Sequence, residues 1–278
     1  MVYLAYDGSL NGDWVSRYAI RFAAHSPERT LNLLHVLDGK VPEAELERKI
    51  EHLRRECLGQ GVELFPQLLP LAHGVFLSLA QTIPTGPESV VVCGTRVRST
   101  RKPFLRGTFA EQLLCHGAFP VLAVRVVQPG LLGIPRELLI PLAGHPRGLT
   151  TVWPFFRLFL PDLERVHLLR GMVVSTLRLR HLSAKEHQAL REQGVRYLAA
   201  VLDELRQRLG ETDFHLDSRI VVCDDWVREI LVHASKLKSR LILLGASERT
   251  RWHRALHGDA LERVLRGTPC DVGIYRWP

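Results

Sequence analysis

The sequence predicts an α/β protein built from two tandem, doubly wound domains, each with a five-stranded parallel sheet. Short apolar segments of strand length alternate with longer segments of helical periodicity along the whole chain. This alternation is typical of parallel sheets that helices cover on both faces. The pattern also occurs twice, and several glycines, acids and arginines recur with it, which indicates a duplicated domain.

The first half contains five apolar segments that we predict to be strands: 2–7, 31–37, 62–69, 89–94 and 119–127. Between them, amphipathic helices are predicted at about 12–25, 42–58, 73–83 and 107–117. Parallel strands need crossover connections, and these are right-handed, so the β-α-β-α-β-α-β-α-β order predicts a doubly wound domain.

The second half repeats this order, with predicted strands at 137–143, 165–174, 214–222, 240–245 and 271–277. At an offset of 151, Gly94 matches Gly245, Gly107 matches Gly258, Glu111 matches Glu262 and Arg125 matches Arg276, while Gly8 matches Gly144 at an offset of 136. The difference falls mainly in the long helical segment 183–210. A linker rich in proline and glycine, 127–137, separates the halves, so the predicted domains are residues 1–128 and 136–278.

The composition is that of a globular protein, with 46% hydrophobic and 24% charged residues. The five cysteines are widely spaced and form no C-x-x-C pair, which favours buried thiols in a reducing cytoplasm over disulfides or a zinc site. No signal peptide and no apolar segment long enough for a membrane span is recognised. The net charge of +8 is spread along the chain, so solvated helix faces explain it better than nucleic-acid binding does.

Ligands of doubly wound sheets bind at the carboxyl ends of the strands, where the strand order reverses. In the first half these ends are Asp7-Gly8-Ser9 and Gly94-Thr95-Arg96. A basic loop follows, and Gly107-Thr108-Phe109 then begins a helix whose free N–H groups favour an anion. A carboxylate beside an anion site suits a mononucleotide. Walker, dinucleotide, hydrolase-elbow and zincin motifs are absent from the sequence.

These residues resemble the universal stress protein family. Its nucleotide-binding members carry G-x2-G-x9-G-[ST] after the fourth strand and an aspartate at the end of the first. The first half reads Gly94-x2-Val97-x9-Gly107-Thr108, with Asp7 at the end of its first strand, and 111–125 resembles the family's last helix and strand. The resemblance covers both halves and implies a tandem, Rossmann-like member that binds ATP or AMP at most once per half.

The resemblance implies a cofactor site in the first half, formed by Asp7, Val36, Gly94, Arg96, Val97, Gly107, Thr108 and Phe109. Asp7 would bind the ribose, the backbone of Val36 would contact the adenine, and the glycines with Thr108 would bind the phosphates. Val97 replaces the family's middle glycine and brings methyl groups close to the phosphate position, where neighbouring arginines offer compensating charge.

The second half departs further from the family pattern. Glu248 and Asp259 stand at its phosphate positions, and Ala143 replaces the ribose-binding aspartate. Like charges beside a phosphate are unfavourable, so we expect this half to have lost the site. His253 and His257 are spaced like a metal pair, but without a third ligand we expect a solvated pair. No metal is predicted beyond a magnesium ion associated with the nucleotide.

Simpler explanations apply to several of these residues. Asp7 suits the turn that Asp-Gly-Ser favours, and Thr108 suits a helix N-cap as well as a phosphate ligand. Asp224 and Asp225 precede a helical segment, where capping explains them better than acid–base catalysis. Cys93 is expected to be a small buried residue. The segment 153–160 is apolar enough for a buried helix or an oligomer contact.

No combination of nucleophile, base and orienting group stands out, so the protein is not predicted to be an enzyme. The resemblance implies a cytoplasmic stress-response regulator that binds an adenine nucleotide in its first half and is recognised by an unidentified protein partner. The alternatives are a structural or interaction module with both sites vestigial, and a slow ATPase. The family also implies that strands 120–127 and 271–277 pair edge to edge as an intramolecular pseudo-dimer; a homodimer is left open.

Overall fold

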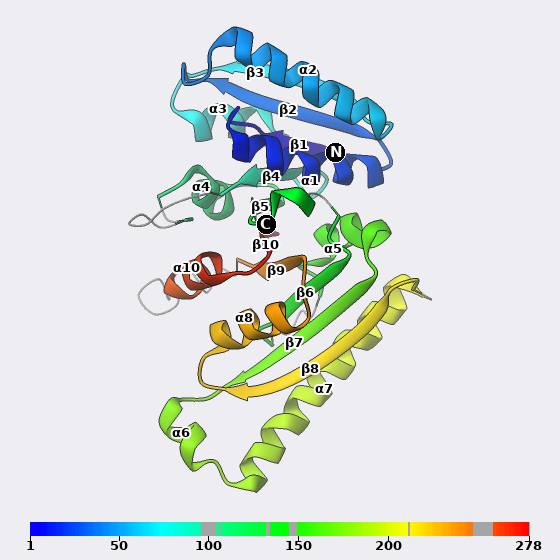
Figure 1. The fold of residues 1–278 in the computed structure, drawn as a ribbon, viewed down its shortest axis with the longest axis vertical. Coiled ribbons are helices and arrows are strands. Elements are labelled where there is room, and N and C mark those ends of the chain that lie inside the picture. The colour runs from blue at the N-terminus through cyan, green and yellow to red at the C-terminus, as the bar shows by residue number, and fades with distance from the viewer. Residues whose placement is uncertain are drawn as a thin grey trace.

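A computed structural model describes residues 1–95, 104–105, 107–131, 134–144, 149–210, 212–246 and 258–277 of the chain. These residues form one ten-stranded sheet in the order β3-β2-β1-β4-β5-β10-β9-β6-β7-β8. The sheet runs from β3 at one end of the molecule to β8 at the other, with the C-terminal strand near its centre (Figure 1). In the part of the chain that is described, no helix is both long and apolar enough to cross a membrane.

The first half follows the predicted order of elements. Its strands are β1 (Val2–Ala5), β2 (Thr30–Leu37), β3 (Glu63–Pro70), β4 (Val90–Gly94) and β5 (Val121–Arg125). Its helices are α1 (Leu10–His25), α2 (Glu43–Gly59), α3 (Val75–Thr82) and α4 (Phe109–His116).

The second half repeats the order after the short 3₁₀ helix η1 (Pro129–Leu131). Its strands are β6 (Glu137–Leu142), β7 (Arg165–Val173), β8 (His215–Cys223), β9 (Leu241–Gly245) and β10 (Asp271–Arg276). Its helices are α5 (Trp153–Phe159), η2 (Leu160–Asp162), α6 (Thr176–His181), α7 (Ala184–Leu209), α8 (Trp226–Lys236) and α10 (Gly258–Gly267). All ten predicted strands are present, with ends shifted by at most two residues. The boundaries 1–128 and 136–278 stay a prediction.

The two halves share one strand order, 3-2-1-4-5 in the first and 8-7-6-9-10 in the second. Pairing is parallel within each half, while β5 and β10 pair antiparallel from Arg125 opposite Val272 to Val121 opposite Arg276. This confirms the predicted edge-to-edge pairing of the last strands. As a consequence, the carboxyl ends of the first-half strands lie at the same edge of the sheet as the amino ends of the second-half strands.

Two hydrophobic cores cover the two faces of the sheet, and each extends through both halves. One core contains residues of α1, α2, α5 and α7, and the other contains residues of α3, α4, α8 and α10. Neighbouring residues of a strand enter different cores, as Tyr3 and Leu4 of β1 do. The nearly continuous apolar strands of the sequence therefore reflect burial on both faces.

Helix α5 forms part of the contact between the halves. Phe155, Phe156 and Phe159 are fully buried, and the ring of Phe159 meets the ring of Phe22 in α1 edge-on, with centroids 4.8 Å apart. Such an aromatic pair contributes about 0.5–1.5 kcal/mol beyond its buried area. Of the two alternatives for segment 153–160, the structure shows a buried helix.

Candidate functional site

The carboxyl ends of β1 and β4 lie next to each other in the sheet. Ala5 of β1 is opposite Cys93 of β4, and β2 pairs with the other side of β1. The turn at 7–9 and the segment 94–95 therefore leave the sheet side by side at the point where the strand order reverses. This is the crevice in which doubly wound proteins bind ligands, and the sequence analysis placed Asp7 and Gly94 there.

Asp7 organises the turn that begins α1. Its Oδ1 accepts hydrogen bonds from the backbone N–H of Ser9 (3.0 Å) and from the Ser9 hydroxyl (2.7 Å). Ser9 in turn caps the helix, because its Oγ accepts from the N–H of Gly12. Asp7 is exposed, and its Oδ2 receives no hydrogen bond from the described residues. Asp7 therefore stabilises the turn with Oδ1 and still presents Oδ2 to a ligand.

Asn11, which the sequence analysis did not single out, ties α1 to the end of β4. Its Nδ2 donates to the carbonyl oxygen of Thr95 at 3.0 Å. A Cβ on Gly94 would lie 2.5 Å from this Nδ2, so the glycine permits the close approach. The only signal in the sequence is an asparagine in the first turn of the helix that follows Asp-Gly-Ser.

Two buried polar atoms at this crevice have no hydrogen-bond partner among the described residues, Asn11 Oδ1 and Thr95 Oγ1. Both residues are at most 9% exposed. Because buried polar groups are nearly always hydrogen-bonded, these atoms are candidates to bind a ligand.

At the start of helix α4, the N–H groups of Gly107 and Glu111 are already engaged. Thr108 is the N-cap, and its Oγ1 accepts from the N–H of Glu111 at 3.2 Å. The carboxylate of Glu111 accepts from the N–H of Gly107 at 2.7 Å. Phe109, the first residue of the helix, packs against the core. A phosphate at Gly107 would have to replace the Glu111 carboxylate.

A contact from the second half holds the chain just before Gly107. The carboxylate of Glu262 in α10 accepts from the N–H groups of Phe104 and Leu105, both at 2.7 Å. The guanidinium carbon of Arg125 lies over the ring of Phe104, 4.1 Å from the ring centroid. The guanidinium of Arg266 also lies over this ring. The halves therefore meet at the segment that leads to the predicted phosphate site, a relationship that the sequence analysis missed.

The remaining predicted site residues are only partly described. Val36 is buried at the end of β2, and its carbonyl oxygen accepts from the N–H of Asp38 at 2.8 Å. Arg96 and Val97 lie outside the described residues, as do Glu248, His253 and His257; of Asp259 only the backbone, in α10, is described.

Two simpler explanations are confirmed. Burial, with a smaller effect of the Asp7 charge, raises the pKa of the Cys93 thiol to about 12, which suits a buried residue and not a nucleophile. Asp225 caps α8, because its Oδ1 accepts from the N–H groups of Val227 and Arg228. Among the described residues, no group of three His, Cys, Asp or Glu side chains could hold a metal ion.

The corresponding turn of the second half has a different environment. Gly144 repeats the positive φ of Gly8, +81° against +71°. The Arg170 guanidinium lies beside it and donates to the carbonyl oxygens of Leu142 (3.1 Å) and Gly171 (2.9 Å). A Cβ on Gly8 would instead meet Val41. The second half thus has an arginine beside a turn that lacks the aspartate.

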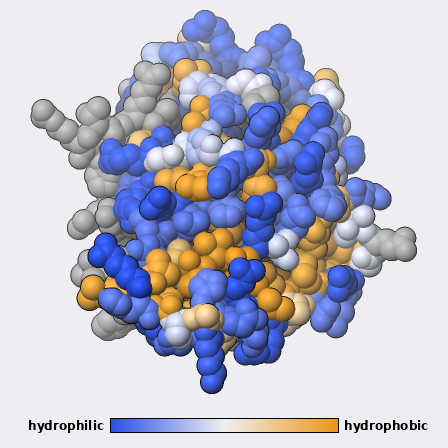
Figure 2. Space-filling view, turned by 60° about the horizontal axis from the view of Figure 1, so that its bottom comes forward, coloured by the Kyte–Doolittle hydropathy of each residue, from blue (hydrophilic) through white to orange (hydrophobic). Residues whose placement is uncertain are grey.

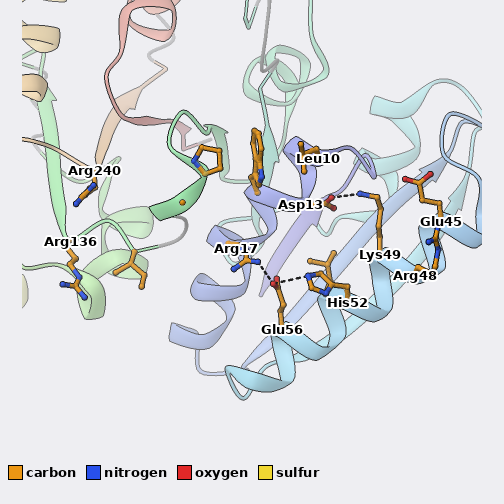
Figure 3. Close-up of a pocket in the computed structure, with 15 residues that line it drawn as sticks. Leu10, Asp13, Arg17, Glu45, Arg48, Lys49, His52, Glu56, Arg136 and Arg240 are labelled. Atoms are coloured by element: carbon orange, nitrogen blue, oxygen red, sulfur yellow. Dashed lines mark hydrogen bonds and ion pairs between the residues drawn. The ribbon is translucent and has the colours of Figure 1, made fainter.

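A groove of about 980 Å³ lies on the α1–α2 face. In Figure 3, α1 and α2 form one side, and Arg136 and Arg240 approach from the second half. Two of its lining acids are paired in the groove wall: Asp13 with Lys49 at 2.5 Å, and Glu56 with Arg17 and His52 at 2.5 and 3.3 Å. None of the predicted site residues lines it, so this groove is separate from the candidate nucleotide site.

Comparisons with known proteins agree with the fold and the duplicated architecture. The sequence model of the universal stress protein family matches residues 163–276. The chain resembles a universal stress protein from Archaeoglobus fulgidus, with 14% identity and a TM-score of 0.60 over 98% of this chain and 95% of that one. A functionally unknown protein from Pseudomonas aeruginosa shares 16% identity and a TM-score of 0.59 over 98% and 91%.

The fold also occurs in the cytoplasmic domain of a prokaryotic cation chloride cotransporter, at 10% identity and a TM-score of 0.55 over 99% of this chain and 94% of that one. No curated protein sequence matches the chain. Residues 163–276 therefore match the universal stress protein family, and the whole chain has the fold of the universal stress protein from Archaeoglobus fulgidus. The family model matches the half in which the sequence predicts a lost nucleotide site.

Proposed function

We propose that the chain is a stress-response regulatory protein that binds an adenine nucleotide, ATP or AMP, in its first half. Any magnesium ion would enter with the nucleotide. Binding of the nucleotide would change a surface that a protein partner recognises. No catalytic step on the nucleotide is proposed. The five free cysteines favour the cytoplasm as the compartment.

The observation that supports this proposal most is the adjacency of two segments at the β1–β4 switch point. Asp7 presents a carboxylate oxygen there, and the amide of Asn11 fixes Thr95 at the end of β4. Carboxylates bind ribose hydroxyls in doubly wound folds, and helix N-termini such as that of α4 bind phosphates. The free polar atoms of Asn11 and Thr95 would complete the contacts.

The experiment is titration calorimetry of ATP and of AMP against the parent protein and three variants. Asp7→Ala should abolish binding, because it removes both the ribose contact and the turn. Asp7→Asn keeps an acceptor for Ser9 and should weaken binding by losing the charge alone. Asp203→Ala, which removes an exposed carboxylate from α7, is the control and should bind as the parent does. Equal affinity of all three variants would remove Asp7 from the site.

A second candidate is an interaction module in which both sites are vestigial. The hydrogen bond from Gly107 to the Glu111 carboxylate favours it, because an acid occupies a donor that a phosphate needs. Under this alternative, protein purified without added nucleotide contains none, and neither ATP nor AMP gives heat in the titration.

A further inference from the structure

The two edges of the ten-stranded sheet, β3 and β8, differ in their ability to pair with another strand. Successive residues of a strand direct their backbone groups toward opposite neighbours. In β3, the N–H of Glu63 donates to Arg29, so odd-numbered residues face β2. The outward positions therefore include Pro66 and Pro70, which lack an N–H. Edge prolines of this kind prevent further pairing.

The β8 edge has no such protection. The N–H of His215 donates to Glu164, and the carbonyl of Cys223 accepts from Val174, so odd-numbered residues of β8 face β7. The outward residues are Leu216, Ser218, Ile220 and Val222, and each has both an N–H and a C=O. Over nine residues, β8 presents an open strand edge.

The charges on β8 are complementary to themselves in one antiparallel register. If Ser218 lies on a two-fold axis, it pairs with Ser218 of a second copy, and Asp217 lies opposite Arg219. These are non-hydrogen-bonded positions, at which opposing side chains approach most closely. Shifting the register by two residues would oppose Asp217 to Asp217 or Arg219 to Arg219. Among these three registers, charge favours the one centred on Ser218.

Both charged side chains are accessible for this contact. The Asp217 side chain is 44% exposed and lies 3.5 Å from His167 and 3.3 Å from His215. Arg219 is exposed and makes no ion pair or side-chain hydrogen bond with the described residues. A carboxylate on a second copy would supply the partner that Arg219 lacks.

An apolar surface accompanies the open edge. Helix α7 lies close to β8 at Gly194. A Cβ at this position would be only 2.9 Å from the side chain of Ile220. A groove of about 560 Å³ runs between them, and on the helix it is lined by Arg191 and by the apolar residues Val195, Leu198, Ala199 and Leu202. Val195 is 55% exposed. Figure 2, which turns the β8 end of the molecule forward, shows a broad hydrophobic area on its lower half.

We propose that the chain forms a homodimer in which β8 pairs antiparallel with β8 of a second copy, centred on Ser218. The pairing extends the sheet across both copies, opposes Asp217 and Arg219 twice, and brings the apolar stripes of the two α7 helices together. The candidate nucleotide crevice lies in the other half of each chain, so the dimer leaves it open. This proposal does not rest on nucleotide binding.

The first test is the molar mass in solution, measured by sedimentation equilibrium over a concentration series. The parent protein should be dimeric. Ser218→Pro removes an outward N–H without breaking a bond to β7, and should give a monomer with an unchanged circular dichroism spectrum. Leu68→Pro at an outward, exposed position of β3 is the matched control and should remain dimeric. A monomeric parent, or a Ser218→Pro variant that is still dimeric, would overturn the proposal.

Charge reversal tests the register. Asp217→Arg and Arg219→Asp each create two pairs of like charges in a homodimer and should raise the dimer Kd by about tenfold or more. An equimolar mixture of the two variants restores both opposite-charge pairs and should form heterodimers. A mixture that stays as weak as the separate variants would overturn this register, even if the parent is a dimer.

Discussion

The phenol of Tyr18 in α1 donates a 2.6 Å hydrogen bond to the carboxylate of Asp271 at the start of β10. The other carboxylate oxygen accepts from the N–H groups of Val127 (2.7 Å) and Gln128 (3.1 Å). Asp271 is 3% exposed. One buried acid therefore joins the first helix, the linker and the last strand, and holds the two halves together.

Tyr18→Phe leaves that buried carboxylate with one donor fewer. We expect the free energy of unfolding to fall by about 1–3 kcal/mol, measured by urea denaturation. Tyr3→Phe is the control, because Tyr3 is also buried but its hydroxyl donates to the sulfur of Met1, at 3.8 Å, and not to a buried carboxylate. A loss no larger for Tyr18→Phe than for Tyr3→Phe would contradict the assigned role.

Asp271 also makes stability depend on pH. Burial raises its pKa above the ordinary value of 3.8, although the hydrogen bonds from Tyr18, Val127 and Gln128 lower it in part. The native state therefore holds a proton that the unfolded state releases first. The stability from this group is complete below the unfolded pKa and is lost as the pH rises through the folded pKa.

Asp271→Asn removes this titration while keeping an acceptor for the linker. Relative to the parent, the variant should gain stability as the pH rises from about 3.8 toward neutrality, as followed by urea unfolding at a series of pH values. A stability difference that does not change with pH would show that Asp271 ionises normally in the folded protein.

Gly94→Ala should destabilise the end of β4. The added Cβ would stand 2.5 Å from Nδ2 of Asn11, and overpacking of this kind costs about 1–3 kcal/mol. Asn11→Ala removes the clash, so Gly94→Ala should be much less harmful in that background. The double-mutant cycle by urea denaturation measures this coupling. Additive effects would mean that the two residues do not contact each other.

Glu262→Gln should weaken the contact between α10 and the segment before Gly107, because it replaces one of the two acceptor oxygens for Phe104 and Leu105. We expect lower stability and, if the first half binds nucleotide, lower affinity. Glu204→Gln is the matched control, since Glu204 accepts from the N–H of Leu149 and the hydroxyl of Thr150 within the second half. Glu204→Gln should lower stability without lowering nucleotide affinity. Equal effects of both variants on affinity would contradict a link between the Glu262 contact and the nucleotide site.

The sequence was sufficient to predict the strands, because burial on both faces of a parallel sheet makes each strand almost continuously apolar. The position of Asp7 beside Gly94 also followed, since it depends only on strand order. The roles of Asn11, Glu262 and Asp271 could not be predicted. Each depends on a tertiary contact, such as the one between Tyr18 and Asp271, 253 residues apart, which no periodicity in the sequence encodes.

The most direct test of the proposed function is the number of nucleotide sites per chain. Equilibrium dialysis with labelled ATP should give at most one site, which Asp7→Ala removes. The second half lacks the aspartate and has Ala143 in its place, while Glu248 and Asp259 add negative charge in its sequence; each such charge near a phosphate could cost about 1 kcal/mol or more. Two equal sites, or one site that persists in Asp7→Ala, would contradict the account.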